Sequence, residues 1–432
     1  SHLEGNQVDF YGGVFSVTKA SKFSINNCTF IFNYAGLQGG VLDIASAAVL
    51  FNINSTFKAN SAHNSGGCLL ISHIDIIKTI KCLFYKNKAL KSIGSTYSVS
   101  YIKSVWIVNT IFSYNWARDG GALSIQYTKN VSFVNVCVYN NGAMQNGGGL
   151  SVSEVNFCVI HNCSFLNNSA KNGCGILLVN FQISHILNSK MLHNKCKVDG
   201  PGAYVLSGRI LNIKSCLHYN NSAKMRGGSL TTKHIDLVVI SNSSFSHNIA
   251  NFEGGGASIE YGNSAAIRYS TFLQNTGVEE AGALYFDLVK NISLVKNHFQ
   301  ENFASSIGGA IYVTTVSFIW NVECSYISNV ARKKSGGSII LSKATLLINI
   351  KCKYICSKSG ASGGAIHISH VKVILNLYCE FVNNQAVIFG GCIYSFGGNE
   401  IKAISSNFTK NSAEKGGCIY YASLKYIETI KC

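Results

Sequence analysis

The feature that most constrains the fold is a sequence repeat that returns along the whole chain. In residues 55–71, "STFKANSAHNSGGCLLI", an aromatic residue, an asparagine, an alanine and a glycine pair follow one another at fixed spacing. The order returns at "SSFSHNIANFEGGGASI" and "SNFTKNSAEKGGCIY". Repeats of 26–28 residues indicate a solenoid, because one such unit cannot bury its apolar face without neighbours. The glycine pair or its degenerate form begins at 16 positions: Gly12, Gly39, Gly66, Ile93, Gly120, Gly147, Gly173, Gly200, Gly227, Gly254, Ala281, Gly308, Gly336, Gly363, Gly390 and Gly416.

A second column of residues keeps the same period and predicts an interior aromatic ladder. Phenylalanine holds ten of its 15 places, and Val138, Met191, His218, Tyr326 and Tyr354 hold the others. We expect these side chains to point inward and to lie on their neighbours in the turns above and below. The phenylalanines are Phe30, Phe57, Phe84, Phe112, Phe165, Phe245, Phe272, Phe299, Phe381 and Phe408.

Two polar or small residues follow each ladder position. An asparagine stands three residues after it in every repeat except the one with Ser357. We expect this asparagine at a turn, where its side chain bonds local backbone and the next asparagine, and where its tolerance of left-handed backbone angles is useful. The alanine two residues later, as at Ala62 and Ala250, fits a tight inward corner.

The segments between these landmarks predict short strands and no helices. "GGALSIQY", after a glycine pair, and "VVISNSSF", before an aromatic, alternate or run apolar with β-branched residues and end in turn residues. Two or three such strands per repeat, each stacked on its counterpart in the next repeat, make a parallel β-helix. We therefore expect an all-β, single-stranded parallel β-helix (solenoid) of about 16 coils, continuous over residues 1–432.

The combined motif also resembles a known family. "FSYNWARDGGAL" and "FQENFASSIGGAI" are similar to the repeats of bacterial polymorphic outer-membrane proteins, which are autotransporter passengers. The resemblance covers nearly the whole chain. It implies a pectin-lyase-like, right-handed parallel β-helix that is extracellular or on the cell surface and acts as an adhesin or a rigid structural rod.

Pectin-lyase-like folds include polysaccharide lyases and hydrolases, so an enzyme is the alternative prediction. Those reactions need clustered carboxylates in a cleft. The 19 acidic residues are scattered, and the best candidate is Glu253 with Glu280, which stand 27 residues apart and should stack near the glycine turn. Such a pair can bind a cation or share a proton, but we interpret it as two solvated turn residues. We predict no enzyme and no catalytic residues.

Other chemical motifs are weak. His367 and His370 in "HISH", and Cys158, His161 and Cys163 in "CVIHNC", have residue types that ligate metals, but strand alternation sends neighbouring side chains to opposite faces. We predict no metal and no cofactor. We interpret His218, which takes an aromatic place in the ladder column, as a hydrogen-bonded interior histidine.

The formal net charge of +17 restricts the partners that the chain attracts. Its longest basic run is only "RKK", Arg332 to Lys334, and aromatic and basic residues do not interleave as on a nucleic-acid surface. We predict no nucleic-acid partner, and keep surface glycans and an anionic-glycan-binding module as an alternative. No apolar run approaches the roughly 18 residues that a membrane span needs, so we expect none in this chain.

Cysteine is frequent, with 16 residues. Those two residues before a ladder position should point inward, and Cys68, Cys392 and Cys418 directly follow a glycine pair. Cys352 with Cys379, and Cys392 with Cys418, should be stacked neighbours, either as disulfides or, as their parallel Cβ directions favour, as buried thiols. Cys356 points outward and is the candidate for a bond outside the core. The inward set is Cys28, Cys82, Cys163, Cys216, Cys324, Cys352 and Cys379.

Asparagine sequons and the chain ends complete the expectations. Asn27, Asn54, Asn162 and Asn242 share the column three residues before the ladder and should face solvent. If the protein is eukaryotic, every sequon is a predicted glycosylation site. The sequence stops inside a repeat and shows no cap, so we expect either further coils beyond both ends or self-association, end-to-end into a filament or lateral. The sequons are at Asn27, Asn54, Asn130, Asn162, Asn167, Asn220, Asn242, Asn291 and Asn407.

Overall fold

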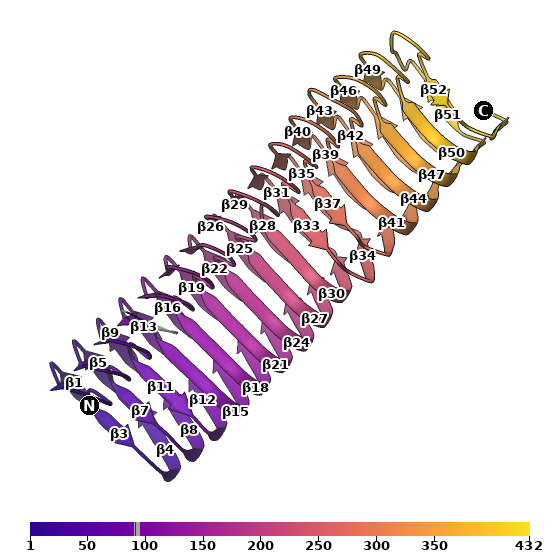
Figure 1. Ribbon diagram of the computed structural model, residues 1–432. Coiled ribbons are helices and arrows are strands. Elements are labelled where there is room, and N and C mark those ends of the chain that lie inside the picture. The colour runs from indigo at the N-terminus through magenta and orange to yellow at the C-terminus, as the bar shows by residue number, and fades with distance from the viewer. Residues whose placement is uncertain (90, 92–95) are drawn as a thin grey trace. The chain divides into compact units, whose positions relative to one another are not determined.

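The computed structural model describes residues 1–89, 91 and 96–432, and the degenerate glycine-pair position at Ile93 lies outside them. The chain divides into two compact units, Ser1–Asn212 and Ile213–Cys432. Within each unit the described residues form strands and no helix, and the strands stack in parallel, turn on turn (Figure 1). The fold is thus an all-β parallel solenoid with about 16 turns in all, as the repeat predicts.

One stack of short strands, the aromatic sheet, carries the ladder residue at the centre of almost every strand. In the first unit its strands are β1 (His2–Glu4), β5 (Thr29–Ile31), β9 (Thr56–Lys58), β13 (Leu83–Tyr85), β16 (Ile111–Ser113), β19 (Cys137–Tyr139), β22 (Ser164–Leu166) and β25 (Lys190–Leu192). In the second unit they are β28 (Leu217–Tyr219), β31 (Ser244–Ser246), β35 (Thr271–Leu273), β39 (His298–Gln300), β42 (Ser325–Ile327), β45 (Lys353–Ile355), β48 (Glu380–Val382) and β51 (Asn407–Thr409).

A second stack, the corner sheet, consists of two-residue strands that mostly end on a small residue. In the first unit they are β2 (Gln7–Val8), β6 (Tyr34–Ala35), β10 (Ser61–Ala62), β14 (Lys88–Ala89), β17 (Trp116–Ala117), β20 (Gly142–Ala143), β23 (Ser169–Ala170) and β26 (Lys195–Cys196). In the second unit they are β29 (Ser222–Ala223), β32 (Ile249–Ala250), β36 (Thr276–Gly277), β40 (Phe303–Ala304), β43 (Val330–Ala331), β46 (Lys358–Ser359) and β49 (Gln385–Ala386).

The third stack, the long sheet, holds the apolar segments that follow the glycines. Its strands from the first unit are β3 (Phe15–Val17), β4 (Ala20–Asn26), β7 (Leu42–Ile44), β8 (Ala47–Ile53), β11 (Leu69–Ser72), β12 (Ile74–Ile80), β15 (Tyr97–Val108), β18 (Leu123–Val134), β21 (Leu150–His161), β24 (Ile176–Leu187) and β27 (Ala203–Lys214), whose last residues belong to the second unit. The others, in the second unit, are β30 (Leu230–Ser241), β33 (Ala257–Glu260), β34 (Ser264–Arg268), β37 (Leu284–Asp287), β38 (Asn291–Val295), β41 (Ile311–Val322), β44 (Ile339–Ile350), β47 (Ile366–Leu377), β50 (Ile393–Ile404), β52 (Ile419–Ala422) and β53 (Tyr426–Ile430).

The aromatic ladder is confirmed in both units. In the first unit the ring centroids of Phe30 and Phe57 lie 4.9 Å apart and those of Phe57 and Phe84 lie 4.6 Å apart, with nearly parallel planes. In the second unit the stack runs from His218 to Phe408 without a break, with neighbouring centroids 4.1–5.0 Å apart. The spacing matches the distance between adjacent strands, so each ring covers the next.

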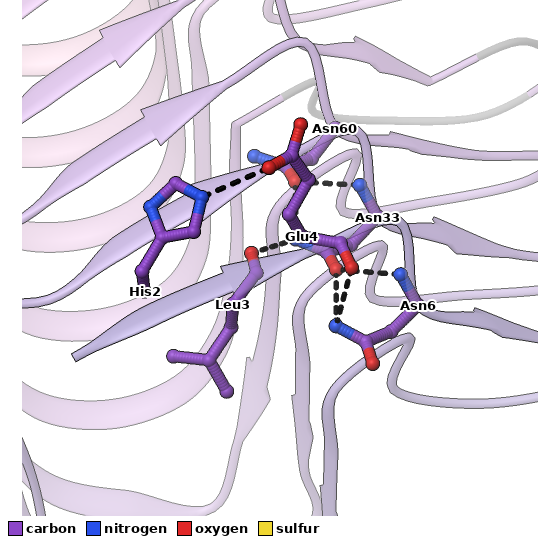
Figure 2. Close-up of polar contacts among 6 residues, drawn as sticks. All are labelled: His2, Leu3, Glu4, Asn6, Asn33 and Asn60. Carbon is purple, nitrogen blue, oxygen red and sulfur yellow. Dashed lines mark hydrogen bonds and ion pairs between the residues drawn. The ribbon is translucent and has the colours of Figure 1, made fainter.

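The asparagine column forms a second, polar ladder inside each unit. Figure 2 shows its start: the Nδ2 of Asn33 donates to the carbonyl oxygen of Leu3 at 3.2 Å and to Oδ1 of Asn60 at 2.9 Å, while Asn6 donates to Oδ1 of Asn33. Asn33 and Asn60 are fully buried. The side chain thereby satisfies corner carbonyl and amide groups that the short strands leave unpaired.

The left-handed backbone conformation lies one residue before this asparagine and not on it. Phe32 has φ of 54°, Ala59 of 54° and Lys86 of 56°. A buried asparagine in an ordinary conformation supplies the hydrogen bonds, and the residue before it, exposed at Phe32 and Lys86 and half-buried at Ala59, makes the bend. The two roles that the sequence pattern suggested for one asparagine are therefore divided between neighbours.

The glycine pair is explained by two separate constraints. The first glycine bends the chain, as at Gly39 with φ of +65°. A Cβ on the second, Gly40, would lie 2.2 Å from the carbonyl oxygen of Gly67 in the next turn. A side chain at Gly40 would clash at that approach, so this glycine keeps its turn at contact distance from the next.

The inward cysteines are buried as predicted, except that Cys28 is half-buried. Cys352, Cys379, Cys392 and Cys418 are free thiols, and Sγ of Cys392 lies 3.6 Å from Sγ of Cys418. Cys356 is half-buried and accepts a hydrogen bond from Nδ2 of Asn383.

In the described part of the chain, a disulfide outside the predicted pairs joins Cys174 and Cys196, with Cα atoms 5.7 Å apart. Cys174 takes the place of the second glycine of its repeat, and Cys196 is paired with Ala170 in the corner sheet. The bond therefore joins two different columns, which a search for stacked cysteines within one column does not examine.

Candidate functional site

An acidic cluster in the second unit is centred on the pair predicted from the sequence. Glu253 and Glu280 are joined by a parallel β-bridge, so the expected stacking is confirmed. Glu260 and Asp287, at the ends of β33 and β37, are a register pair on the same two turns. We call these four residues the carboxylate cluster.

Two cations neutralise part of the carboxylate cluster. Nε of Arg226 lies 2.8 Å from Oε2 of Glu253, and its Nη1 lies 3.2 Å from Oε2 of Glu260. Nζ of Lys233 lies 3.3 Å from the same Glu260 oxygen. The Glu260 side chain is only 2% exposed, and its other oxygen accepts a hydrogen bond from Ser258. A carboxylate so deeply buried is retained only with such partners, which indicates a structural role for Glu260.

The stacked pair itself titrates at higher pH than free carboxylates. Burial raises the pKa of Glu253, and Arg226 opposes this by favouring the ionised form. Burial also raises the pKa of Glu280, the charge of Glu253 raises it further, and Lys334 opposes the rise. A half-buried carboxyl beside a like charge holds its proton more tightly, which is the property of a general acid.

Two tyrosines lie within the electrostatic range of the carboxylate cluster. Burial and the charges of Glu253 and Asp287 raise the pKa of Tyr285 far above its usual value, and burial raises that of Tyr312. Both phenols therefore stay protonated near neutral pH. The cluster thus combines ion-paired carboxylates with neutral phenols.

The weaker histidine and cysteine motifs are not brought together. His367 is largely buried, which lowers its pKa to about 4, and its ring stacks on Tyr394, whereas His370 is exposed. Cys158 and Cys163 are buried. Within the described residues there is no group of three or more His, Cys, Asp or Glu side chains placed to hold a metal ion.

The solvent-facing column of asparagines is confirmed. Asn27, Asn54, Asn162 and Asn242 are exposed, and each has a φ between 48° and 53°, at a bend of the turn. The other sequon asparagines are exposed too, except Asn291, which is half-buried. The accessibility that glycosylation needs is present, and occupancy stays a prediction.

A groove in the second unit was not among the expectations. It has a volume of about 410 Å³ and lies where the chain bends between β37 and β38 and at the middle of β41, β44 and β47. Lys290, Lys343 and Lys372 line it, and we call it the lysine groove. The sequence signal was weak, because each lysine comes from a different repeat and none belongs to a basic run.

One comparison with known proteins gave a match. Residues 298–314 match the profile of the Chlamydia polymorphic membrane protein repeat. This stretch covers β39, β40 and the start of β41, and it contains "FQENFASSIGGAI". No curated protein and no solved structure matches the chain. Such a repeat in a parallel solenoid fits a surface or adhesin-like β-helical protein.

The described residues were also searched for helices that might cross a membrane. None of sufficient length and apolar character occurs among them.

Proposed function

We propose that this chain is part of an extracellular or cell-surface protein that acts as a rigid structural or adhesive element without enzymatic activity. The observation that carries the proposal is the polymorphic membrane protein repeat at residues 298–314, located on turns of a parallel solenoid. A solenoid has an extended outer surface in proportion to its core, which suits adhesion better than an enclosed active site.

Surface exposure is tested on intact cells of the source organism. Antibodies raised against the purified chain should label intact cells, and mild proteolysis of those cells should release peptides from the described turns. Labelling that appears only after the cells are permeabilised would contradict the proposal.

The absence of enzymatic activity is a separate part of the proposal. It is supported by the ion pairs of Arg226 with Glu253 and Glu260, which hold two of the clustered carboxylates in place. The alternative is a carbohydrate-active lyase or hydrolase, and the raised pKa of Glu280 is the observation that favours it. Incubation with polygalacturonan and related acidic polymers, with and without calcium, should yield no new chain ends. If the parent protein degrades one of these polymers and Glu280→Gln abolishes that activity, the enzyme alternative is correct.

Self-association and glycosylation belong to the same proposal. We expect end-to-end or lateral association, because stacked strands template further strands. Light scattering of the purified chain and electron microscopy of native material should show assemblies, and monodisperse monomers in both would exclude them. Mass spectrometry of native material should find glycans on exposed sequons such as Asn242 if the source is eukaryotic.

A further inference from the structure

The lysine groove has a surface that combines positive charge with a buried apolar floor. Lys290, Lys343 and Lys372 are exposed along it, and His370 stands beside them. Its volume of about 410 Å³ falls within the range of ligand-binding clefts. Among the described residues that line it, none is acidic.

The three lysines are not neutralised by the protein. In the described part of the chain none of them forms an ion pair. This differs from Lys233 and Lys353, which are paired with Glu260 and Glu380. The groove therefore keeps its positive charge available for an outside anion.

The charges are spread across four successive turns, with Lys343 displaced along its strand from the column that Lys290 and Lys372 share. Lys290 directly precedes β38, Lys343 lies on β44 and Lys372 on β47, and β41 lies between β38 and β44. Adjacent strands are ~4.8 Å apart, so the three backbone positions span roughly 14 Å over successive turns. Positive charges spread over this length suit an extended polyanion better than a single small ion.

The remaining lining offers two further kinds of contact. Val316 and Ala344 are buried and form an apolar floor. The side-chain hydroxyls of Thr315, Ser317 and Thr345 donate to no other described residue. Hydroxyls beside an apolar floor match a sugar ring, which has polar edges and apolar faces.

We propose that the lysine groove binds an acidic polysaccharide whose carboxylate or sulfate groups lie against Lys290, Lys343 and Lys372. A single-stranded nucleic acid is disfavoured, because its non-specific sites use aromatic platforms for the bases and no described residue lining the groove is Phe, Tyr or Trp. The inference deepens the proposed surface function by naming a ligand class. It rests on that function only in assuming that the protein meets the ligand at the cell surface.

The test is direct binding by the purified full chain. Polygalacturonate oligomers and dextran sulfate represent the carboxylate and sulfate sources, and neutral dextran is the uncharged control. Binding to at least one acidic polymer, weakened by added salt, and none to neutral dextran is expected. Replacing all three groove lysines (Lys290→Gln, Lys343→Gln, Lys372→Gln) should weaken binding by about tenfold or more.

A matched variant separates the groove from net charge. The matched variant removes an equal number of positive charges from the longest basic run, which does not line the groove. It carries Arg332→Gln, Lys333→Gln and Lys334→Gln. This variant should bind within about twofold of the parent. All six side chains are exposed, so both variants should fold, and their thermal unfolding is measured alongside.

Three results would overturn the inference. Equal loss of binding in both variants would show that the overall charge, not the groove, binds the polymer. No binding to either acidic polymer would show that the groove is not a polysaccharide site. Tighter binding of single-stranded DNA, lost only in the groove variant, would replace the polysaccharide by nucleic acid. None of these results affects labelling of intact cells, so the proposed surface location is judged independently.

Discussion

Two columns of the second unit are built by the same repeat but behave differently. The aromatic column is fully buried from His218 to Phe381 and continues turn after turn to Phe408, which is half-buried. The acidic column has Glu253 and Glu280 in successive turns and then Ile307, so it ends after two turns.

The difference follows from what each column contacts. A buried ring is covered on both faces by its neighbours, and a smaller group in its place leaves a cavity. A corner side chain contacts water on one side, so each turn tolerates a different residue there. Chemical variety, and with it the charge patterns of the acidic column and the lysine groove, is therefore located at positions that at least partly face solvent.

The largest effect should come from opening the aromatic column. Phe272→Ala removes a ring that is 0% exposed and stacked between Phe245 and Phe299. It should destabilise the protein by roughly 3–5 kcal/mol, as a large-to-small core change does. Chemical denaturation of the full chain, with hydrogen exchange of the neighbouring turns, measures the loss.

An exposed aromatic residue supplies the control for that change. Trp320, on β41, is 39% exposed. Trp320→Ala should cost less than about 1 kcal/mol. Equal losses in the two variants would show that the ladder contributes no more than a surface ring.

The next largest effect should come from the polar ladder. Nδ2 of Asn275 donates to the carbonyl oxygen of Phe245 and to Oδ1 of Asn302, and its own Oδ1 accepts from Asn248. Asn275→Ala leaves several buried groups without partners and should cost roughly 2–4 kcal/mol in denaturation experiments. Asn263→Ala, at an exposed position, should change stability by no more than about 0.5 kcal/mol. A neutral result for Asn275→Ala would mean that water replaces the ladder bonds.

A third prediction uses the one histidine in the aromatic column. Burial lowers the pKa of His218 from 6.5 to about 3, and its ring lies 4.1 Å from that of Phe245. Between these pKa values the unfolded chain binds a proton that the folded chain does not, so stability falls as the pH drops below 6.5. At pH 5 this group alone should cost about 2 kcal/mol relative to pH 7.5.

The variant His218→Phe removes that proton-linked loss. Its stability relative to the parent should therefore rise by about 2 kcal/mol between pH 7.5 and pH 5, measured by denaturation at both values. His247→Gln changes an exposed histidine. The stability of this variant relative to the parent should be nearly the same at pH 7.5 and pH 5. A difference for His218→Phe that does not vary with pH would show that the ring is protonated inside the fold.

The interior was predictable from the sequence because burial demands the same residue type at every turn. Phe272 and Asn275 stand in columns that a period of about 27 residues makes visible. Features that join different columns left no periodic signal. The Cys174–Cys196 disulfide links a glycine position with a corner position, and the lysine groove takes its charges from separate repeats.

The smallest effect concerns the acidic column, and its dependence on pH is opposite in sign to that of His218. Burial and the charge of Glu253 raise the pKa of Glu280 above its usual value of 4.5, so the folded chain holds this proton more tightly than the unfolded chain. The resulting cost to stability is absent below about pH 4.5 and is complete once the pH exceeds the folded pKa.

Glu280→Gln cannot ionise and should therefore stabilise the protein slightly at pH 7, within the about 0.5 kcal/mol typical of surface changes, with no gain at pH 4. Glu301→Gln provides the opposite case, because hydrogen bonds from Gln300 and Gln274 lower the pKa of Glu301. Its ionised form is favoured by folding, so this variant should lose stability at pH 7 and regain it in acid. Denaturation curves of both variants at the two pH values compare the signs. A loss of stability for Glu280→Gln at pH 7 would mean that its carboxylate is held by cations, as Glu260 is, and that the acidic column is as structural as the aromatic one.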